Sequence, residues 1–352
     1  MYKLKFPIES NKKLKMEKKM IEKQIPLSVL DLVPIGEDFT INEAIKNSTK
    51  LAQAVEEFKF NRYWIAEHHN MNGIASAATS VILSYIGANT KKIRIGSGGI
   101  MLPNHAPLVI AEQFGTLESL YPNRIDLGLG RAPGTDRKTM LALRKDIYND
   151  GSDFPIMLDE LQFYLSDYQN KDSIKAVPGF GLDIPIWLLG SSTFSAQLAA
   201  QKGLPFAFAS HFAPDLMEEA IKIYRLNFKP SKQLKEPYII VCINAICANT
   251  LEEAEFLATT ELQKFLYIQR GDNRLLPKPT KDMSSLWELW EERTIKNKIR
   301  ESIWGTPEIV KNGLEKLVKR TNANEIMINS WIYNPEDRIK SYKLISEIWG
   351  LN

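Results

Sequence analysis

The stretch RYWIAEHH, residues 62–69, indicates how the rest of the chain is folded. It opens with aromatic and β-branched residues around Trp64, which is typical of a strand, and it ends in the titratable side chains Glu67, His68 and His69. In parallel sheets and barrels, functional groups gather at the carboxyl ends of the strands. We therefore interpret this stretch as a strand that ends at an active face. Buried, hydrogen-bonded strand histidines would explain this stretch by itself just as well.

The other two histidines favour the same interpretation. The chain contains four histidines, and His105 and His211 follow apolar, strand-like runs at residues 93–102 and 205–210. All four histidines therefore stand at or just past the ends of predicted strands, where an active face is expected.

The composition is that of a soluble globular protein, with 44% hydrophobic and 25% charged residues in a chain of 352. The formal net charge of +3 is too close to balance to indicate nucleic-acid binding. The two cysteines, Cys242 and Cys247, have an odd spacing within one apolar run, so they point to opposite faces of a strand and do not pair. We therefore predict a cytoplasmic protein without a metal site.

Residues 1–24 differ from the rest of the chain. They are rich in lysine, with short acidic interruptions, and they lack the apolar core that a signal peptide needs. We expect a flexible basic tail here and a single folded domain at residues 25–352. No segment of the sequence is long and apolar enough to suggest a membrane span.

After the tail, apolar runs of strand length alternate with segments of helical periodicity. The predicted strands are 26–32, 62–69, 93–100, 124–131, 186–189, 206–210, 238–248 and 325–332. The predicted helices are 42–58, 75–89, 107–121, 137–147, 155–168, one that contains 195–201, 214–228, 251–269, a tryptophan-rich helix around 287–290, one that starts at Thr306-Pro307-Glu308, and 335–349. Eight strands, each followed by a helix, predict an α/β fold of the (β/α)8 TIM type, with insertions at 135–184 after the fourth strand and at 271–302 after the seventh.

A doubly wound open sheet is the alternative fold. Such a sheet usually carries a glycine-rich fingerprint after an early strand. Gly128 and Gly130 form a Gly-x-Gly pair, but no third glycine opens a helix at the required distance, so the barrel is favoured.

The third predicted strand contains the glycine-rich segment GSGG at residues 96–99. Glycine weakens a strand, so its repetition indicates either a bulge that lets a flat ligand lie against the backbone or a tight bend of the barrel.

Two further segments suit an anion. Arg131 ends the fourth strand and offers a cation to a phosphate or carboxylate, or else to a surface ion pair. The segment GSSTFS, residues 190–195, joins the fifth strand to its helix and combines small residues, hydroxyls and free helix N–H groups. Ordinary N-capping by one of its serines is the simpler explanation. Together with the glycine-rich strand, these segments predict a site for a phosphorylated aromatic cofactor.

These segments resemble bacterial luciferase and the luciferase-like flavin-dependent monooxygenases, over nearly the whole chain from residue 25. The resemblance is most specific in SVLDL (28–32), AEHH (66–69), GSGGIMLP (96–103) and GLGRAPG (128–134), with GSS (190–192) and GTPE (305–308) adding to it. It implies a TIM-type barrel that binds FMN, as reduced flavin supplied by a separate reductase, and it implies a homodimer or a heterodimer of close relatives. Light emission does not follow from it.

The resemblance also implies roles for single residues. His68 corresponds to the histidine that acts in luciferase catalysis, and the Gly98–Gly99 bond corresponds to the position of a non-prolyl cis peptide beneath the flavin ring. The positions that correspond to flavin and phosphate binding are Arg131, Gly190, Ser191, Ser192 and Ser195. Luciferase has an acid and a serine where this chain has Gly190-Ser191, so the detailed phosphate contacts stay open.

We therefore expect a monooxygenase that uses reduced FMN and O2 to oxygenate a small apolar organic substrate, such as an aldehyde, with His68 as general acid or base. The insertions at 135–184 and 271–302 are candidates for a lid and substrate selector, and a flavin reductase is the expected transient partner. Two other classes stay open: a deazaflavin-dependent dehydrogenase on the same barrel, and a flavin-binding family member without catalysis.

Overall fold

A computed structural model describes residues 25–132, 136–144, 151–167 and 173–351. The predicted tail at 1–24 lies outside the described residues, as does the Pro133-Gly134 end of the RAPG segment. Among the described residues, none of the helices combines the length and the apolar character that a membrane span requires.

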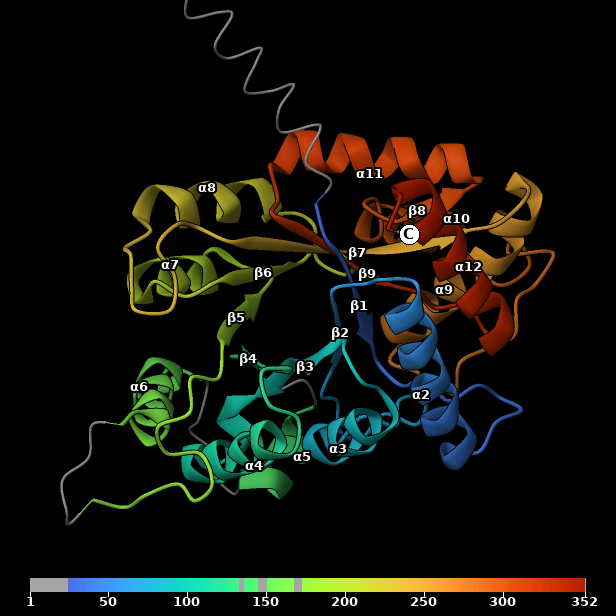
Figure 1. Ribbon diagram of the computed structural model, residues 1–352. Coiled ribbons are helices and arrows are strands. Elements are labelled where there is room, and N and C mark those ends of the chain that lie inside the picture. The colour runs from blue at the N-terminus through green and yellow to red at the C-terminus, as the bar shows by residue number, and fades with distance from the viewer. Residues whose placement is uncertain (1–24, 133–135, 145–150, 168–172, 352) are drawn as a thin grey trace, which may run out of the picture.

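Eight parallel strands close into a barrel, so the predicted TIM-type fold is confirmed and the open sheet is not formed (Figure 1). In order around the barrel the strands are β1 (Leu27–Asp31), β2 (Arg62–Ile65), β3 (Arg94–Met101), β4 (Ile125–Gly130), β5 (Ile186–Gly190), β6 (Phe206–Ala209), β7 (Ile239–Cys247) and β9 (Glu325–Asn329). Strand β9 pairs with β1, which completes the closure.

Helices surround the barrel on its outside (Figure 1). They are α2 (Ile41–Glu57), α3 (Thr79–Asn89), α4 (Pro107–Leu120), α5 (Arg137–Arg144), α6 (Phe154–Leu165), α7 (Thr193–Lys202), α8 (Met217–Asn227), α9 (Leu251–Gln269), α10 (Leu289–Lys298), α11 (Pro307–Thr321) and α12 (Pro335–Trp349), with a short 3-10 helix at Leu102–Asn104. Local chemistry sets several of their ends. Thr40 and Glu43 form a capping box at the start of α2, and Gly203 and Gly350 end α7 and α12 in the left-handed conformation.

Three features of the strands differ from the prediction. Strand β9 ends at Asn329 rather than at residue 332. The second strand ends at Ile65 rather than at His69, because His68 N–H donates to Ser76 O, within its own loop, instead of to a neighbouring strand. A short additional strand, β8 (Ile303–Gly305), pairs with the carboxyl end of β7. Its three residues are too few to show a period-2 pattern in the sequence.

The barrel separates two apolar cores. Its interior holds Trp64 and Trp187, whose rings meet nearly edge to face with centroids 5.3 Å apart. The layer between strands and helices holds alternate residues such as Tyr63. Cys242 lies in the interior core and Cys247 in the outer layer, so the two cysteines point to opposite faces as predicted, and both are free.

A buried ion network closes the amino-terminal end of the barrel. Arg62 Nη1 donates to Asp126 Oδ2 at 2.8 Å, and Arg62 Nε donates to Glu325 Oε1 at 2.8 Å. Tyr238 also donates its hydroxyl to Glu325. Each buried charge in this network is paired and hydrogen-bonded, so the network has a structural role, as is usual for the amino-terminal end of a TIM-type barrel. The histidines lie at the opposite end of the barrel, where the carboxyl ends of the strands meet.

Candidate active site

Glu67 is the anchor of the barrel mouth, and it joins the segments that follow β2 and β3. Its Oε1 atom lies 2.8 Å from His69 Nε2 and 2.8 Å from His105 Nε2, and its Oε2 atom accepts the N–H of Met101 at 3.0 Å. Burial favours the neutral acid, but the hydrogen bonds from His105 and His69 outweigh it and lower the pKa of Glu67 to about 2. Glu67 is therefore a carboxylate that fixes both rings.

Glu67, His69 and His105 also form the kind of group that can bind a metal, since their donor atoms lie within 4.8 Å of one another. The hydrogen bonds from His69 and His105 to the Glu67 carboxylate already explain why these three side chains lie together. The prediction that the chain has no metal site stays a prediction.

His68 faces a different neighbour, although it adjoins His69 in the sequence. His211 follows β6 and is buried, and burial, with a smaller contribution from His68, lowers its pKa to about 3. Within the described part of the chain, His211 Nδ1 is a buried atom without a hydrogen-bond partner. The structure thus brings together two histidines from opposite halves of the sequence, one of them neutral at any physiological pH.

Beside them, strand β3 carries the predicted bulge. The register between β3 and β4 shifts between Ser97 and Ile100, and the Gly98–Gly99 peptide bond is cis, as the resemblance implied. A side chain at Gly98 would come within 2.7 Å of Leu30 Cδ1. Tight packing of the barrel therefore requires glycine here as well, so a ligand contact is not needed to explain it. Flavin contact at Gly98 and Gly99 stays a prediction.

Arg131 and the start of α7 lie together. The Arg131 Cζ atom is 4.3 Å from the ring centroid of Phe194, the second residue of α7. Ser192 stands at the N-cap position, but its side chain makes no capping hydrogen bond, so the simpler explanation of this serine does not hold. The helix start therefore offers N–H groups beside a cation. Ser195 is buried beneath Gly190, where any side chain on Gly190 would collide with Ser195 Oγ.

Further polar atoms at the carboxyl end are buried. Within the described residues, Ser330 Oγ and Trp331 Nε1, which follow β9, have no hydrogen-bond partner. Buried polar groups are nearly always satisfied, and leaving one unpaired costs ~1–3 kcal/mol. Such atoms are typical of a site that a ligand completes. The sequence did not single out these two residues, because neither type is unusual after a strand.

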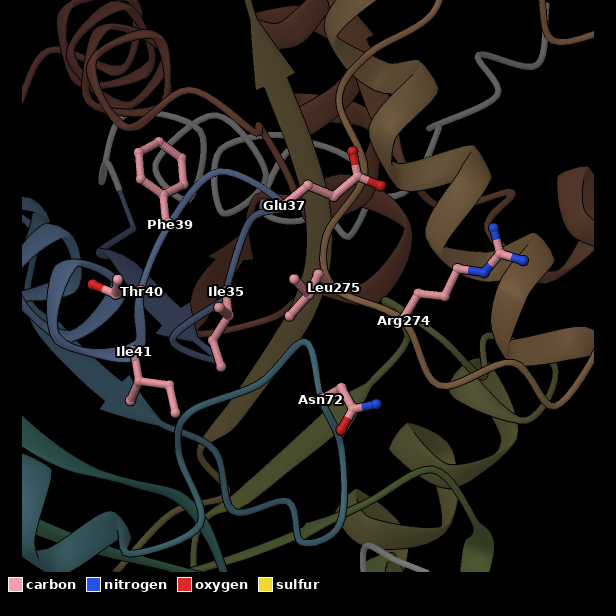
Figure 2. A pocket seen from close by; sticks show the side chains of 8 residues that line it. All are labelled: Ile35, Glu37, Phe39, Thr40, Ile41, Asn72, Arg274 and Leu275. Atoms are coloured by element: carbon pink, nitrogen blue, oxygen red, sulfur yellow. The ribbon is translucent and has the colours of Figure 1, made fainter.

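A groove of about 660 Å³ lies beside this mouth, on the loops that follow β1 and β2 (Figure 2). Its lining residues are Ile35, Glu37, Phe39, Thr40, Ile41, Asn72, Arg274 and Leu275. The last two belong to the predicted insertion at 271–302. The insertion therefore borders the mouth, as expected of a segment that selects substrates.

Comparison with known proteins points to one family. The family model described as "Luciferase-like monooxygenase" matches residues 26–324. A protein of Escherichia coli (strain K12) that is named luciferase-like monooxygenase is 49% identical over 329 residues, which cover 94% of this chain and 98% of that protein. N-acetyl-S-alkylcysteine monooxygenase of Bacillus subtilis (strain 168) is 32% identical over 329 residues, covering 92% of this chain and 98% of that protein.

Solved structures agree with the fold. Apo-MsnO8 is 33% identical with a TM-score of 0.83, and the match covers 93% of this chain and 99% of that chain. The FMN complex of the oxygenating constituent of 3,6-diketocamphane monooxygenase from Pseudomonas putida has a TM-score of 0.67 at 15% identity, covering 92% and 97%. An F420-dependent secondary alcohol dehydrogenase has a TM-score of 0.67 at 14% identity, covering 92% and 98%. These last two similarities concern the fold alone.

Proposed function

The chain belongs to the luciferase-like monooxygenase family, and from this premise we propose that it uses reduced FMN and O2 to oxygenate a small, largely apolar organic substrate such as an aldehyde. The observation that carries the proposal is the neighbourhood of His68 and His211 at a barrel end that also bears Arg131 and the start of α7. A proton-transfer group and an anion site at one mouth suit a phosphorylated cofactor that meets a substrate there.

The residues at the mouth fit FMN. Arg131 and the N–H groups at the start of α7 would hold the phosphate, with Ser191 and Ser192 beside it. Gly98 and Gly99, in the bulge of β3, would lie against the ring. When bound, reduced FMN supplies the electrons that activate O2.

The two neighbouring histidines have different proposed tasks. His68 holds or moves a proton at an imidazole nitrogen, since histidine changes its charge near neutral pH. His211, with a pKa of about 3, stays neutral and adds no positive charge beside it. Trp64 and Trp187 in the barrel interior exclude water from beneath the site. His69 is held by Glu67, and we assign it to structure.

The test is an oxygenation assay with 18O2. The purified chain receives reduced FMN from a flavin reductase with NADH, together with a panel of aldehydes, ketones and thioethers. We expect one substrate class to gain a single 18O atom and to accelerate NADH use. The His68→Ala variant, which should still bind FMN, is the matched control for oxidation that does not depend on the site.

Two outcomes would replace this proposal. Substrate-dependent reduction of a deazaflavin, without incorporation of oxygen, would make the chain a dehydrogenase, the activity of one fold neighbour. Tight binding of FMN without turnover of any substrate class would indicate a flavin-binding protein that has lost catalysis.

We further propose a transient flavin reductase as partner, a homodimer as the working form, and the cytoplasm as the compartment. Two buried, free cysteines suit a reducing compartment. Exposed apolar side chains on α3 and α4 suit a subunit interface.

A further inference from the structure

Lys264, on helix α9, is buried without a counter-ion. Its exposed fraction is 4%, and lysine is among the residues that are least often buried unless they are paired. Among the described residues, no carboxylate forms an ion pair with it and no hydrogen bond reaches its ammonium group. Burial lowers its pKa, and no neighbouring charge offsets this effect.

The other buried cations show how unusual this lysine is. Arg62 is held by Asp126 and Glu325 at the closed end of the barrel, and Arg338 Nη2 donates to Asp31 Oδ1 at 2.9 Å. These two arginines are structural, because each has an acidic partner. Lys264 has none, so the fold itself does not explain why a cation stands there.

Helix α9 does contain an acid one turn earlier, but that acid faces elsewhere. Glu261 accepts hydrogen bonds from Asn244 Nδ2 at 2.8 Å and Ser302 Oγ at 2.7 Å, and its second oxygen accepts the Trp304 Nε1 proton. All three donors belong to β7 or to the region of β8. Both oxygens of Glu261 are therefore used in that network, and Glu261 forms no ion pair with Lys264.

The surroundings of Lys264 place it at the barrel mouth. Its Nζ atom is 5.9 Å from the ring centroid of Trp331, which follows β9 and belongs to the interior core. A Cβ atom at Gly73, in the loop after β2, would lie 3.3 Å from the same Nζ and 2.5 Å from Arg274 O. Gly73 therefore lies between the lysine and the backbone of Arg274, whose side chain lines the groove of Figure 2, and any larger residue here would collide with that backbone.

This position is not that of the proposed phosphate site. In the order of strands around the barrel, β9 stands opposite β4. Trp331 follows β9 and Arg131 follows β4, so the lysine and the arginine flank opposite sides of the mouth. An anion that neutralises Lys264 would therefore belong to the substrate rather than to the FMN phosphate.

We infer that Lys264, with the Trp331 indole, forms a subsite for an anionic group of the substrate, most simply a carboxylate at the end remote from the oxygenated atom. This inference rests on the proposed function, and it narrows the substrate class to molecules with an apolar reacting end and an acidic end. The ammonium supplies charge-assisted donors, and the unpaired Trp331 Nε1 supplies a further N–H group at the subsite.

The test is equilibrium binding to the full chain without flavin. Octanoate and 1-octanol serve as probes that differ in charge, and titration calorimetry measures each. We expect the parent to bind octanoate more tightly than 1-octanol. Lys264→Met should weaken the binding of octanoate by a factor of about 10–100, as expected when a hydrogen bond to a charged group is lost. The affinity for 1-octanol should not change. Lys264→Arg should retain part of the preference. Lys281→Met, which changes an exposed lysine of the insertion, should bind both probes as the parent does.

Thermal melts separate binding from folding. Removing an uncompensated buried charge should not lower the melting temperature, and octanoate should raise it for the parent but not for Lys264→Met. If Lys264→Met fails to fold, the same titrations on Lys264→Gln decide the question. Equal octanoate binding by parent and variant would overturn the subsite, as would a loss of FMN affinity with octanoate binding intact. If Lys264-dependent octanoate binding holds while no substrate gains 18O, the proposed function fails and the subsite stands.

Discussion

At the scale of single residues, two adjacent histidines differ because the chain leaves strand β2 between Ile65 and the pair. His69 turns to the Glu67 carboxylate, which also holds His105. His68 lies instead beside the buried His211. We therefore propose a structural role for His69 and a catalytic role for His68, and substitution should separate the two roles.

We predict that His68→Ala loses turnover by a factor of roughly 10²–10⁴, the usual worth of a positioned acid or base. FMN affinity should change much less, because the phosphate is assigned to Arg131 and the start of α7. His69→Ala should instead lower the melting temperature, since Glu67 loses one of its donors, while activity per folded molecule is largely kept. Steady-state turnover with reduced FMN and melting curves for both variants check this. Full activity in His68→Ala, or a folded but inactive His69→Ala, would reverse the assignment.

At the scale of elements, the start of helix α7 and the end of strand β4 make one unit. Arg131 stacks on Phe194 at the first turn of the helix, so a group bound there would meet both the cation and the helix N–H groups. The unit depends on the pairing of β4 with β5, which brings residues about sixty positions apart to neighbouring strand ends.

We predict that Arg131→Ala weakens the binding of FMN by about 1.5–3 kcal/mol, the range for a hydrogen bond to a charged group. Riboflavin, which lacks the phosphate, should be affected much less. Fluorescence titration with both flavins measures the difference. Arg137→Ala, which removes an exposed arginine of α5, is the matched control and should bind both flavins normally. Equal losses for FMN and riboflavin in Arg131→Ala would remove this residue from the phosphate site.

Helix α9 is tied to β7 and β8 through a titratable group. Glu261 is fully buried among Asn244, Ser302 and Trp304, and burial raises its pKa from 4.5 to about 7. The folded chain thus keeps a proton between pH 4.5 and 7 that the unfolded chain has released. The contribution of Glu261 to the free energy of unfolding is therefore greatest below pH 4.5. It falls as the pH rises to about 7 and is constant above that.

We predict that the free energy of unfolding loses about 3 kcal/mol from this group between pH 4.5 and pH 8, since one unit of pKa shift corresponds to about 1.4 kcal/mol. In Glu261→Gln, which does not titrate, this part of the slope should vanish. Urea unfolding at a series of pH values provides the measurement. Glu255→Gln, on an exposed position of the same helix, should keep the parent slope. Parallel curves for the parent and Glu261→Gln would show that Glu261 ionises normally.

At the scale of the whole molecule, one side of the barrel presents an apolar surface. Helices α3 and α4 adjoin, since Ser80 Oγ donates to Gln113 across them. Their outer faces expose Val81 at 68%, Val109 at 42% and Leu120 at 56%. In the isolated protomer the outer face of α3 is therefore open to solvent. A second copy of the chain is the occupant that we propose for it.

We predict a homodimer at micromolar concentration, which light scattering coupled to chromatography will detect. The double substitution Val81→Lys and Val109→Lys should yield monomers, because lysine is depleted from the cores of stable interfaces. Leu226→Lys is the control, since Leu226 is 74% exposed on α8, away from this face, and should leave the mass unchanged. A monomeric parent at all concentrations would contradict the assignment.

Local sequence patterns were enough to predict the architecture and most element boundaries. Periodicity and start signals depend on residues close in the chain, which is why helices α9 (Leu251–Gln269) and α12 (Pro335–Trp349) begin and end at the predicted residues. The same local rules placed the two cysteines on opposite faces of β7 and the bulge at residues 96–99. The strand ends already indicated which face carries the histidines.

Which of these side chains are in contact could not be predicted from local patterns and became clear from the folded barrel. Closure of the barrel sets the neighbours of Glu67, the approach of His211 to His68, and the burial of Lys264 without a partner. These are contacts between residues far apart in the chain, and they depend on strand order and register rather than on local pattern. An ordinary lysine in an amphipathic helix looks solvent-exposed in the sequence, and only its place beside Trp331 and the loop at Gly73 shows that it is buried.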